Sequence, residues 1–258
     1  MGLVDTMQYV ARRLLIFGMH VHIGIEDRDL QIDIMNQMSY FMSHILTLST
    51  SSPYWKGQNT GFKSYRSIVF EDLPRTGIPE RFGSAAEYDQ YVRTLISCNS
   101  IEEPSKIWWD IRPHSTFQTL EFRICDCTTK VNDAMAIAAL IPALVSKLIQ
   151  LRQSNQTWRK YRRSLIVENK WRACKNGIDG KHINFGQEQE ISLRALMEEM
   201  LEFVDDVVDP LGSRQEIEYI HTILEKGTSA DRQIACYEKT QSFKAVIDQL
   251  SKETLENC

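Results

Sequence analysis

The chain has 258 residues, of which 43% are hydrophobic and 25% are charged, and its formal net charge is −4. This composition is typical of a globular protein, and the absence of a basic block interleaved with aromatic residues argues against nucleic-acid binding. The first residues lack the features of a signal peptide, and the longest apolar run, residues 134–145, is too short to span a bilayer. We therefore expect a cytoplasmic protein without a membrane segment.

Six cysteines are scattered along the chain, and none forms a C-x-x-C pair. Without an export signal, this spacing indicates reduced thiols rather than a disulfide framework. Cys125 and Cys127 do form a C-x-C pair, which leaves a zinc site with the two histidines of an early H-x-H motif open as an alternative.

The first elements in chain order are a helical pattern over residues 5–16 and a strand over residues 18–25. In the strand, apolar side chains alternate with His20 and His22, so the period of two puts both histidines on one face. A long, methionine-rich helix is predicted over residues 30–49.

Residues 50–67 are rich in Ser, Gly, Asn and aromatic side chains, which predicts a loop. The irregular pattern continues to a helix that starts after Ser84, a predicted N-cap with Glu87 three residues later. We expect that helix to end near Cys98.

Two further strands are predicted over residues 106–114 and 118–127. In the first, Trp108, Asp110 and Arg112 oppose an apolar row, and in the second Glu121, Arg123, Cys125 and Cys127 do so. If these strands share a sheet with the histidine strand, their apolar rows face the helices and their polar rows form a second face.

The rest of the chain has helical spacing. A buried helix over residues 131–151 contains Pro142, and from Ser154 onward the pattern predicts helices only, with Gly177 ending the first of them. No repeat or linker divides the sequence. We therefore predict one α+β domain over residues 1–258, with an antiparallel sheet packed by helices and a helical C-terminal third.

The predicted polar face has three interpretations. Antiparallel sheets commonly leave one face solvated, so each strand alone needs no function. If the face is covered instead, its charges must pair with one another, a metal or a charged ligand, because an unpaired buried charge costs several kcal/mol. Carboxylates and histidines suit Mg²⁺ or Mn²⁺, and arginines suit phosphate. The third interpretation is the zinc site of His20, His22, Cys125 and Cys127.

Four motifs in this order resemble the carboxylate–amine ligases, also called glutamate–cysteine ligase type 2: "GMHVHIGI", "SSPYWKGQNTGFKSYRS", "WWDIRPH" and "TLEFRICDC". The resemblance continues through "NKWRACKNGIDG" and "SADRQ", so that it covers nearly the whole chain. It implies a fold similar to that of glutamine synthetases, in which an antiparallel sheet lines a catalytic funnel.

The resemblance also implies an activity. ATP would phosphorylate the carboxylate of an amino acid such as glutamate, and an amine such as that of cysteine would displace phosphate from the acyl phosphate. The implied cofactors are ATP and Mg²⁺ or Mn²⁺, the partners are small-molecule substrates, and the implied pathway is glutathione biosynthesis.

The matching motif positions imply roles for individual residues. His20 and Glu121 would be metal ligands, and Arg123 would contact the transferred phosphate. Arg66 and Arg112 would hold phosphate or a substrate carboxylate, with Arg66 and Arg123 as the catalytic residues. The remaining implied roles are nucleotide or metal contact for His22 and substrate contact for Trp55, Asn59 and Tyr65. Arg172 and Arg232 match family positions without an implied role.

Members of that family usually begin with a strand resembling G-x-E-x-E-x-x-L, which supplies further metal carboxylates. The resemblance therefore implies that this chain lacks an N-terminal segment, which would leave a sheet edge exposed and favour oligomers. Two alternatives to an active ligase follow: a catalytically impaired relative that acts as a nucleotide-binding or assembly subunit, and the zinc protein described above.

Overall fold

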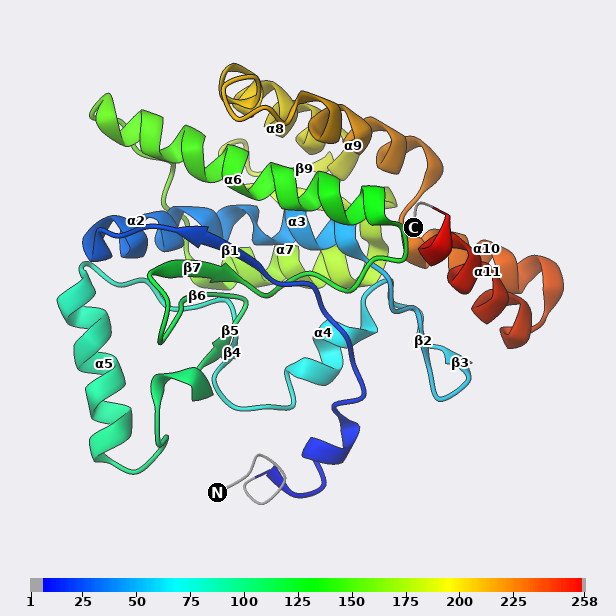
Figure 1. Cartoon of the computed structure of the whole chain (residues 1–258), viewed down its shortest axis with the longest axis horizontal. Helices are drawn as coiled ribbons and strands as arrows, with labels where there is room; N and C mark the ends of the chain where they lie inside the picture. The colour runs from blue at the N-terminus through cyan, green and yellow to red at the C-terminus, as the bar shows by residue number, and fades with distance from the viewer. Residues whose placement is uncertain (1–6, 257–258) are drawn as a thin grey trace.

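The computed structural model describes residues 7–256. Its centre is a three-stranded antiparallel sheet in the order β1 (Val21–Gly24), β7 (Thr119–Phe122), β6 (Ile111–Pro113). Figure 1 shows this sheet in front of α2 (Arg28–Met38) and α3 (Met42–Ser49), with α6 (Val131–Gln153) above it. The predicted α+β class is confirmed, including the shared sheet of the three predicted strands.

The strand register explains the alternation of the sequence. His22 pairs with Glu121, and Glu121 pairs with Arg112, while Val21 and Ile111 both pair with Phe122. Side chains of paired residues lie on the same face, so the polar row and the apolar row separate as predicted.

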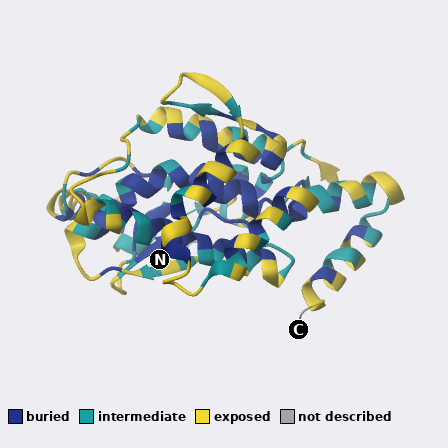
Figure 2. Ribbon diagram, turned by 90° about the horizontal axis from the view of Figure 1, so that it is seen from above, coloured by how far each residue is buried: buried dark blue, intermediate teal, exposed yellow. Residues whose placement is uncertain are grey.

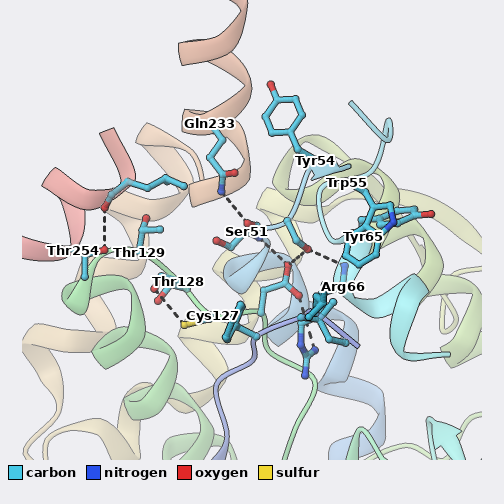
Figure 3. A pocket seen from close by; sticks show the side chains of 16 residues that line it. Ser51, Tyr54, Trp55, Tyr65, Arg66, Cys127, Thr128, Thr129, Gln233 and Thr254 are labelled. Carbon is cyan, nitrogen blue, oxygen red and sulfur yellow. Dashed lines mark hydrogen bonds and ion pairs between the residues drawn. The ribbon is translucent and has the colours of Figure 1, made fainter. Parts of the chain in front are cut away.

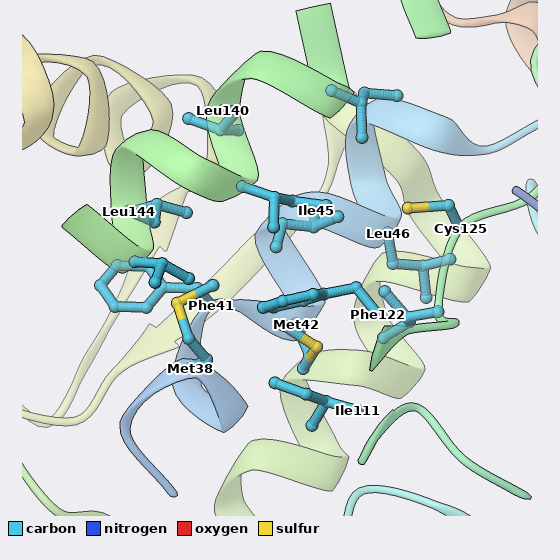
Figure 4. Packing of buried hydrophobic residues seen from close by; sticks show 14 of the residues in the cluster. Met38, Phe41, Met42, Ile45, Leu46, Ile111, Phe122, Cys125, Leu140 and Leu144 are labelled. Carbon is cyan, nitrogen blue, oxygen red and sulfur yellow. The ribbon is translucent and has the colours of Figure 1, made fainter. Parts of the chain in front are cut away.

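The apolar row packs on the methionine-rich helix. Ile111, Leu120 and Phe122 are fully buried, as are Met38 and Met42. Figure 4 shows Phe122 and Ile111 against Met42 and Leu46, with Leu140 and Leu144 of α6 closing the cluster. The predicted helix over residues 30–49 consists of α2 and α3 joined by a 3₁₀ turn, η2 (Ser39–Phe41), and Asp27 caps its start.

The segment between α3 and the strands is more ordered than the sequence predicts. It contains a hairpin of β2 (Tyr54–Trp55) and β3 (Gln58–Asn59), the short helix α4 (Tyr65–Phe70), and β4 (Thr76–Gly77), which pairs with β5 (Trp108–Trp109). Helix α5 (Ala85–Ser97) begins after Ser84, whose hydroxyl accepts from the backbone N–H of Glu87. The predicted N-cap is confirmed.

Helix α6 is longer than the apolar run that suggested it. The helix has 23 residues and runs through Pro142 without a break. By length and composition alone, it is long and apolar enough to cross a membrane. It packs here against α2, α3, α8 (Leu193–Val208) and α9 (Arg214–Lys226). Figure 2 shows the buried residues gathered in the middle of the molecule, and α6 contributes Leu140, Ile141 and Leu144 to them.

The prediction that everything after Ser154 is helical is wrong in two places. Residues 157–162 are irregular, and α7 (Arg163–Asn176) starts after them, because Trp158 and Tyr161 pack into an aromatic cluster with Tyr40. A hairpin of β8 (Lys181–Asn184) and β9 (Gln189–Ser192) follows Gly177, which ends α7 as predicted with φ of 58°.

The predicted helix over residues 5–16 is also wrong in its described part. Met7 is helical, residues 8–10 form a turn, and Ala11–Arg13 form the 3₁₀ turn η1, which buries no residue, so no continuous helix runs to residue 16. An amphipathic pattern without a surface to cover does not stabilise a short helix. Residues 1–6, where the predicted helix begins, lie outside the described part of the chain.

The two arginines without an implied role join helices and strands. Arg172 on α7 contacts Glu168 and, at 2.8 Å, Glu190 of β9. Arg232, on α10 (Ser229–Thr240), contacts Asp133 of α6 and Glu253 of α11 (Phe243–Leu255), each at 3.0 Å. Both side chains therefore hold neighbouring elements together.

Two histidines are buried as neutral groups between α3 and β8. The rings of His44 and His182 lie 5.6 Å apart, and both are almost completely shielded from solvent. Burial lowers the pKa of His44 to about 4 and lowers that of His182 well below its usual range.

We predict that acid destabilises the fold through these histidines. Because their pKa values are lower in the folded than in the unfolded chain, their contribution is complete above pH 6.5 and is lost as the pH falls. The free energy of unfolding should fall between pH 6.5 and 5 by up to about 1.4 kcal/mol per pH unit for each histidine. Urea unfolding of His44→Phe should show a smaller slope, while His221→Gln, at an exposed site, should keep the slope of the unmodified chain. An equal slope in all three proteins would contradict the prediction.

Candidate active site

The polar face of the sheet brings together residues from all three central strands. The Oε1 atom of Glu121 lies 2.6 Å from Nη1 of Arg123 and 3.1 Å from Nδ1 of His20. Its Oε2 atom accepts from Nε of Arg112 at 2.9 Å, and Nε2 of His22 lies 3.8 Å from Oε1. We call these five residues the polar face.

The charged groups of the polar face pair with one another and are largely removed from solvent. Glu121 and Arg112 are 3% and 7% exposed, so neither charge is well solvated. Burial alone would raise the pKa of Glu121, but the hydrogen bond with His20 and the charges of Arg123 and Arg112 outweigh it and hold that pKa well below its usual range. One carboxylate thus faces two guanidinium groups, and the set carries a net positive charge.

The two arginines are used differently. Arg112 donates Nη1 to the backbone carbonyls of Ser105 and Ile107 in addition to its bond with Glu121. The Nε atom of Arg123, in contrast, is buried without a hydrogen-bond partner among the described residues. A buried donor that the protein leaves unsatisfied is rare and favours a ligand or water as its partner. Arg123 is therefore the side chain of this face that is best able to take an anion.

The histidines are oriented by their neighbours. If Nδ1 of His20 donates to Glu121, its Nε2 atom keeps a free lone pair. His22 contacts Thr119 Oγ1 through Nδ1 at 3.0 Å and packs edge-on against His114, with ring centroids 5.3 Å apart. Burial lowers the pKa of His22, while the charge of Glu121 opposes that shift. A neutral His22 is therefore favoured near pH 7.

Asp110 does not join the polar face, although its parity predicts that it should. Its carboxylate lies 2.8 Å from Nζ of Lys170 on α7, which also contacts Glu71 at 3.0 Å. Burial would lower the pKa of Lys170, but Asp110 and Glu71 outweigh it and raise that pKa, so the ammonium stays charged. This ion pair ties α7 to the sheet.

Cys125 is also on the other side of the sheet, which overturns the zinc arrangement. Strand β7 ends at Phe122, and Cys125 is fully buried in the apolar core, where burial raises its thiol pKa to about 12. Figure 4 shows Cys125 among the core side chains near Leu46. Among residues 7–256, no group of three or more His, Cys, Asp or Glu side chains is placed to hold a metal ion.

A cavity of about 390 Å³ lies along the continuation of β1 and β7, and its lining includes no residue of the polar face. Gly18 pairs with Asp126, and the N–H of Met19 donates to the carbonyl of Cys125, so the two chains stay together as far as the cavity. Figure 3 shows Trp55, Tyr65 and Arg66 on one side and Gln233 on the other. The structure therefore brings three predicted substrate-loop residues to one cavity.

Asn59 is not among them. It is exposed at the end of β3, opposite Tyr54 and away from the turn of the hairpin, where its side-chain oxygen accepts from the N–H of Gly61 at 2.9 Å. Arg66 lines the cavity but is mostly used internally: it donates to the carbonyls of Ile124 and Arg123 at 3.1 and 3.0 Å.

Residues that the sequence analysis missed form the floor of the cavity. Asp126 is 1% exposed and accepts from the hydroxyls of Ser52 and Ser64 and from the N–H of Ser51. Burial raises the pKa of Asp126 against the opposing effects of Arg66 and these hydrogen bonds. The signal was present in the run "STSS" (residues 49–52), where the predicted loop begins, and in Asp126 between the two cysteines, because buried acids need such donors.

The sequence profile described as Glutamate-cysteine ligase family 2 matches residues 3–253. Two relatives named "Putative glutamate–cysteine ligase 2" are 55% identical over 255 residues, from Herpetosiphon aurantiacus, and 54% identical over 255 residues, from Roseiflexus castenholzii. The alignments cover 99% of this chain and 66% and 67% of those proteins, so the chain spans about two thirds of their length.

The fold also has a solved counterpart. The crystal structure of a glutamate–cysteine ligase from Francisella tularensis in complex with AMP is similar with a TM-score of 0.62, at 14% identity, over 89% of this chain and 58% of that one. At this identity the similarity concerns the fold.

We predict that the two glycines flanking the histidines differ in their tolerance of a side chain. A Cβ atom at Gly18 would overlap the guanidinium of Arg66, whereas one at Gly24 meets nothing within 4 Å. Gly18→Ala should lower the free energy of unfolding by about 1–3 kcal/mol, because Arg66 must leave its carbonyl partners. Gly24→Ala is the matched control and should change it by less than about 0.5 kcal/mol. Urea titration measures both, and equal stability of the two variants would contradict this packing.

Proposed function

This chain belongs to glutamate-cysteine ligase family 2, and on that premise we propose that its residues 1–258 form a catalytic domain for ATP-dependent ligation of an amino-acid carboxylate to an amine. The names of the relatives support glutamate as the carboxylate and cysteine as the amine. AMP in the structurally similar ligase supports a nucleotide as the third reactant.

One observation carries the proposal. The buried Nε donor of Arg123 has no partner within residues 7–256, and it lies in a face with more positive than negative charge. Transfer of a phosphoryl group depends mainly on positioning and on neutralising the charge of its oxygens. A guanidinium with free donors in a partly shielded site supplies both.

The proposed reaction has two steps. A carboxylate oxygen of the first substrate attacks the γ-phosphorus of ATP, which forms an acyl phosphate and releases ADP. The amine nitrogen then attacks the acyl carbon, the carbon–oxygen bond to phosphate breaks, and an amide and inorganic phosphate leave, with the amine proton passing to solvent or a base. Arg123 would bind the phosphoryl oxygens in both steps, and Glu121 would keep Arg123 and His20 in position.

The neighbouring cavity would hold the amino-acid substrates. Its volume of about 390 Å³ suits a molecule of that size, and its wall joins aromatic side chains, Trp55 and Tyr65, to polar groups. Arg66 would act there mainly by fixing the backbone of residues 123 and 124, since two of its donors are already bound to their carbonyls. Asn59, in its exposed turn, would position the loop rather than contact substrate.

A divalent cation fits this face in part. His20 and Glu121 offer an imidazole nitrogen and a carboxylate oxygen, and Mg²⁺ commonly takes one or two protein carboxylates and fills its remaining positions with phosphate oxygens and water. We propose that these two residues would hold Mg²⁺ or Mn²⁺, which would neutralise phosphate charge when bound. The net positive charge of the polar face predicts weak binding of the ion without nucleotide.

The activity test is phosphate release by this chain. With ATP, Mg²⁺, glutamate and cysteine, phosphate should appear only when both amino acids are present, and Arg123→Met should reduce kcat at least 100-fold because it removes charge stabilisation from the transition state. Arg214→Met, which removes a half-exposed arginine on α9 outside the polar face and the cavity, is the control and should keep full activity. Nucleotide binding without turnover would support a catalytically impaired relative instead, and neither binding nor turnover would refute both.

The metal prediction can be checked without turnover. Electron paramagnetic resonance of Mn²⁺ should show binding that tightens at least tenfold when a non-hydrolysable ATP analogue is added, because phosphate oxygens complete the ligand set. His20→Ala should weaken that binding, and His221→Ala, at an exposed helix position, should not. Equal Mn²⁺ affinity in the two variants would remove His20 from the ligand set.

A further inference from the structure

A second cavity, of about 300 Å³, lies on another part of the molecule. It is formed by the end of α2, the segment around Ile78–Arg81, and the chain that leads into α7. It shares no lining residue with the polar face or with the cavity that contains Arg66. The reaction proposed above therefore does not use it.

The walls of this cavity are strongly basic. Four cationic residues line it, and a single acidic residue, Glu80, lies among them. The cationic residues are Arg81, Lys160, Arg162 and Arg163. In a chain with a net charge of −4, a local excess of three positive charges is a marked concentration.

Most of these cations have no partner of opposite charge. Within residues 7–256, no carboxylate lies within 4.0 Å of the charged nitrogens of Arg81, Lys160 or Arg162. Arg163 is 3.5 Å from Glu80 and donates Nε to the carbonyl of Ile78 at 2.5 Å. Arginines elsewhere in the chain, such as Arg232, are held by carboxylates. Like charges gathered without counter-charges repel one another, and an anion relieves that repulsion.

The backbone that carries two of these cations is fixed. The backbone N–H of Trp158 donates to the side-chain oxygen of Gln37, and the indole ring packs against Phe41, with ring centroids 5.1 Å apart. Tyr161 packs against Tyr40 at 5.4 Å. Both aromatic side chains are held against the core. Lys160, which lies between them in the chain, and Arg162, which follows Tyr161, are therefore directed outward. The cation cluster is therefore set by the fold and does not depend on a mobile tail.

The base of the cavity has a different character. Ile78, Pro79 and Ile166 line it, and all three are buried. An apolar base below cationic walls suits a ligand with a charged group and a carbon body.

We propose that this cavity is a second anion site, which binds a small phosphomonoester. Guanidinium groups bind phosphate oxygens in pairs, and a lysine adds charge without a fixed geometry. The volume accommodates a phosphate with a small organic group, which would rest on Ile78 and Ile166. The site goes beyond the proposed ligation, because it takes a phosphorylated ligand away from the reacting groups.

The test measures binding of phenyl phosphate and inorganic phosphate to the full chain by isothermal titration calorimetry, in 20 and 150 mM NaCl. Phenyl phosphate should bind saturably in both the unmodified chain and Arg123→Met, more tightly than inorganic phosphate and less tightly at the higher salt. The double variant Arg81→Gln/Arg162→Gln should weaken it at least tenfold. Both substituted residues are exposed, so the variant should fold, and its circular dichroism checks this.

The matched control is Lys244→Gln/Lys252→Gln, which removes two exposed positive charges from α11 and should leave the affinity unchanged. Unchanged affinity in Arg81→Gln/Arg162→Gln would overturn the site. Loss of all binding in Arg123→Met would also overturn it, because the phosphate would then bind only at the polar face. Failure of the ligase assay would not affect either result.

Discussion

The arrangement of the central sheet depends on the ionised carboxylate of Glu121. It lies almost out of contact with water, and its charge is stabilised by Arg112 of β6, by Arg123 just after β7 and by His20 just before β1. Replacing it with a neutral group would leave two poorly solvated guanidinium groups without a counter-charge, a loss of about 3–5 kcal/mol. A slip of one residue in either strand pairing would carry Arg112 or Glu121 into the methionine core. The ion pairs and the core therefore specify the same register.

A second network connects the sheet to the loop that precedes α4. Asp126, just beyond β7, accepts hydrogen bonds from Ser51, Ser52 and Ser64, while Arg66 binds the carbonyls of residues 123 and 124. The backbone of Arg123 is thus fixed by Arg66 of α4 as well as by the bond from its N–H to the carbonyl of Asp110. The donor that we propose for phosphate and the wall of the neighbouring cavity are positioned by one continuous set of bonds.

Sequence periodicity predicts this fold where a strand has one buried face. His20, His22, Glu121 and Arg112 were expected on one face and lie there, because the period of two leaves no other arrangement once the apolar row is buried. The same argument failed for Asp110 and Cys125, which lie where β6 begins and beyond the end of β7. The alternation is broken at both positions. Asp110 is directed by its ion pair with Lys170, which is distant in sequence, and Cys125 by the apolar core in which it is buried. The 157–162 segment was misjudged for a similar reason: the aromatic cluster that holds Trp158 is a tertiary property, and it overrides helical spacing.

The contact between Gly18 and Arg66 has an evolutionary consequence. The guanidinium occupies the space that a side chain at position 18 would need, so the two positions cannot vary independently. A larger residue at 18 is tolerated only after Arg66 is replaced by a shorter one, and that replacement alone leaves two backbone carbonyls without their donor. The double replacement removes the overlap but still leaves those two carbonyls without their donor, so neither position changes without a cost. The glycine before the histidine strand and the arginine at the start of α4 should therefore be inherited together, although 48 positions separate them in the chain.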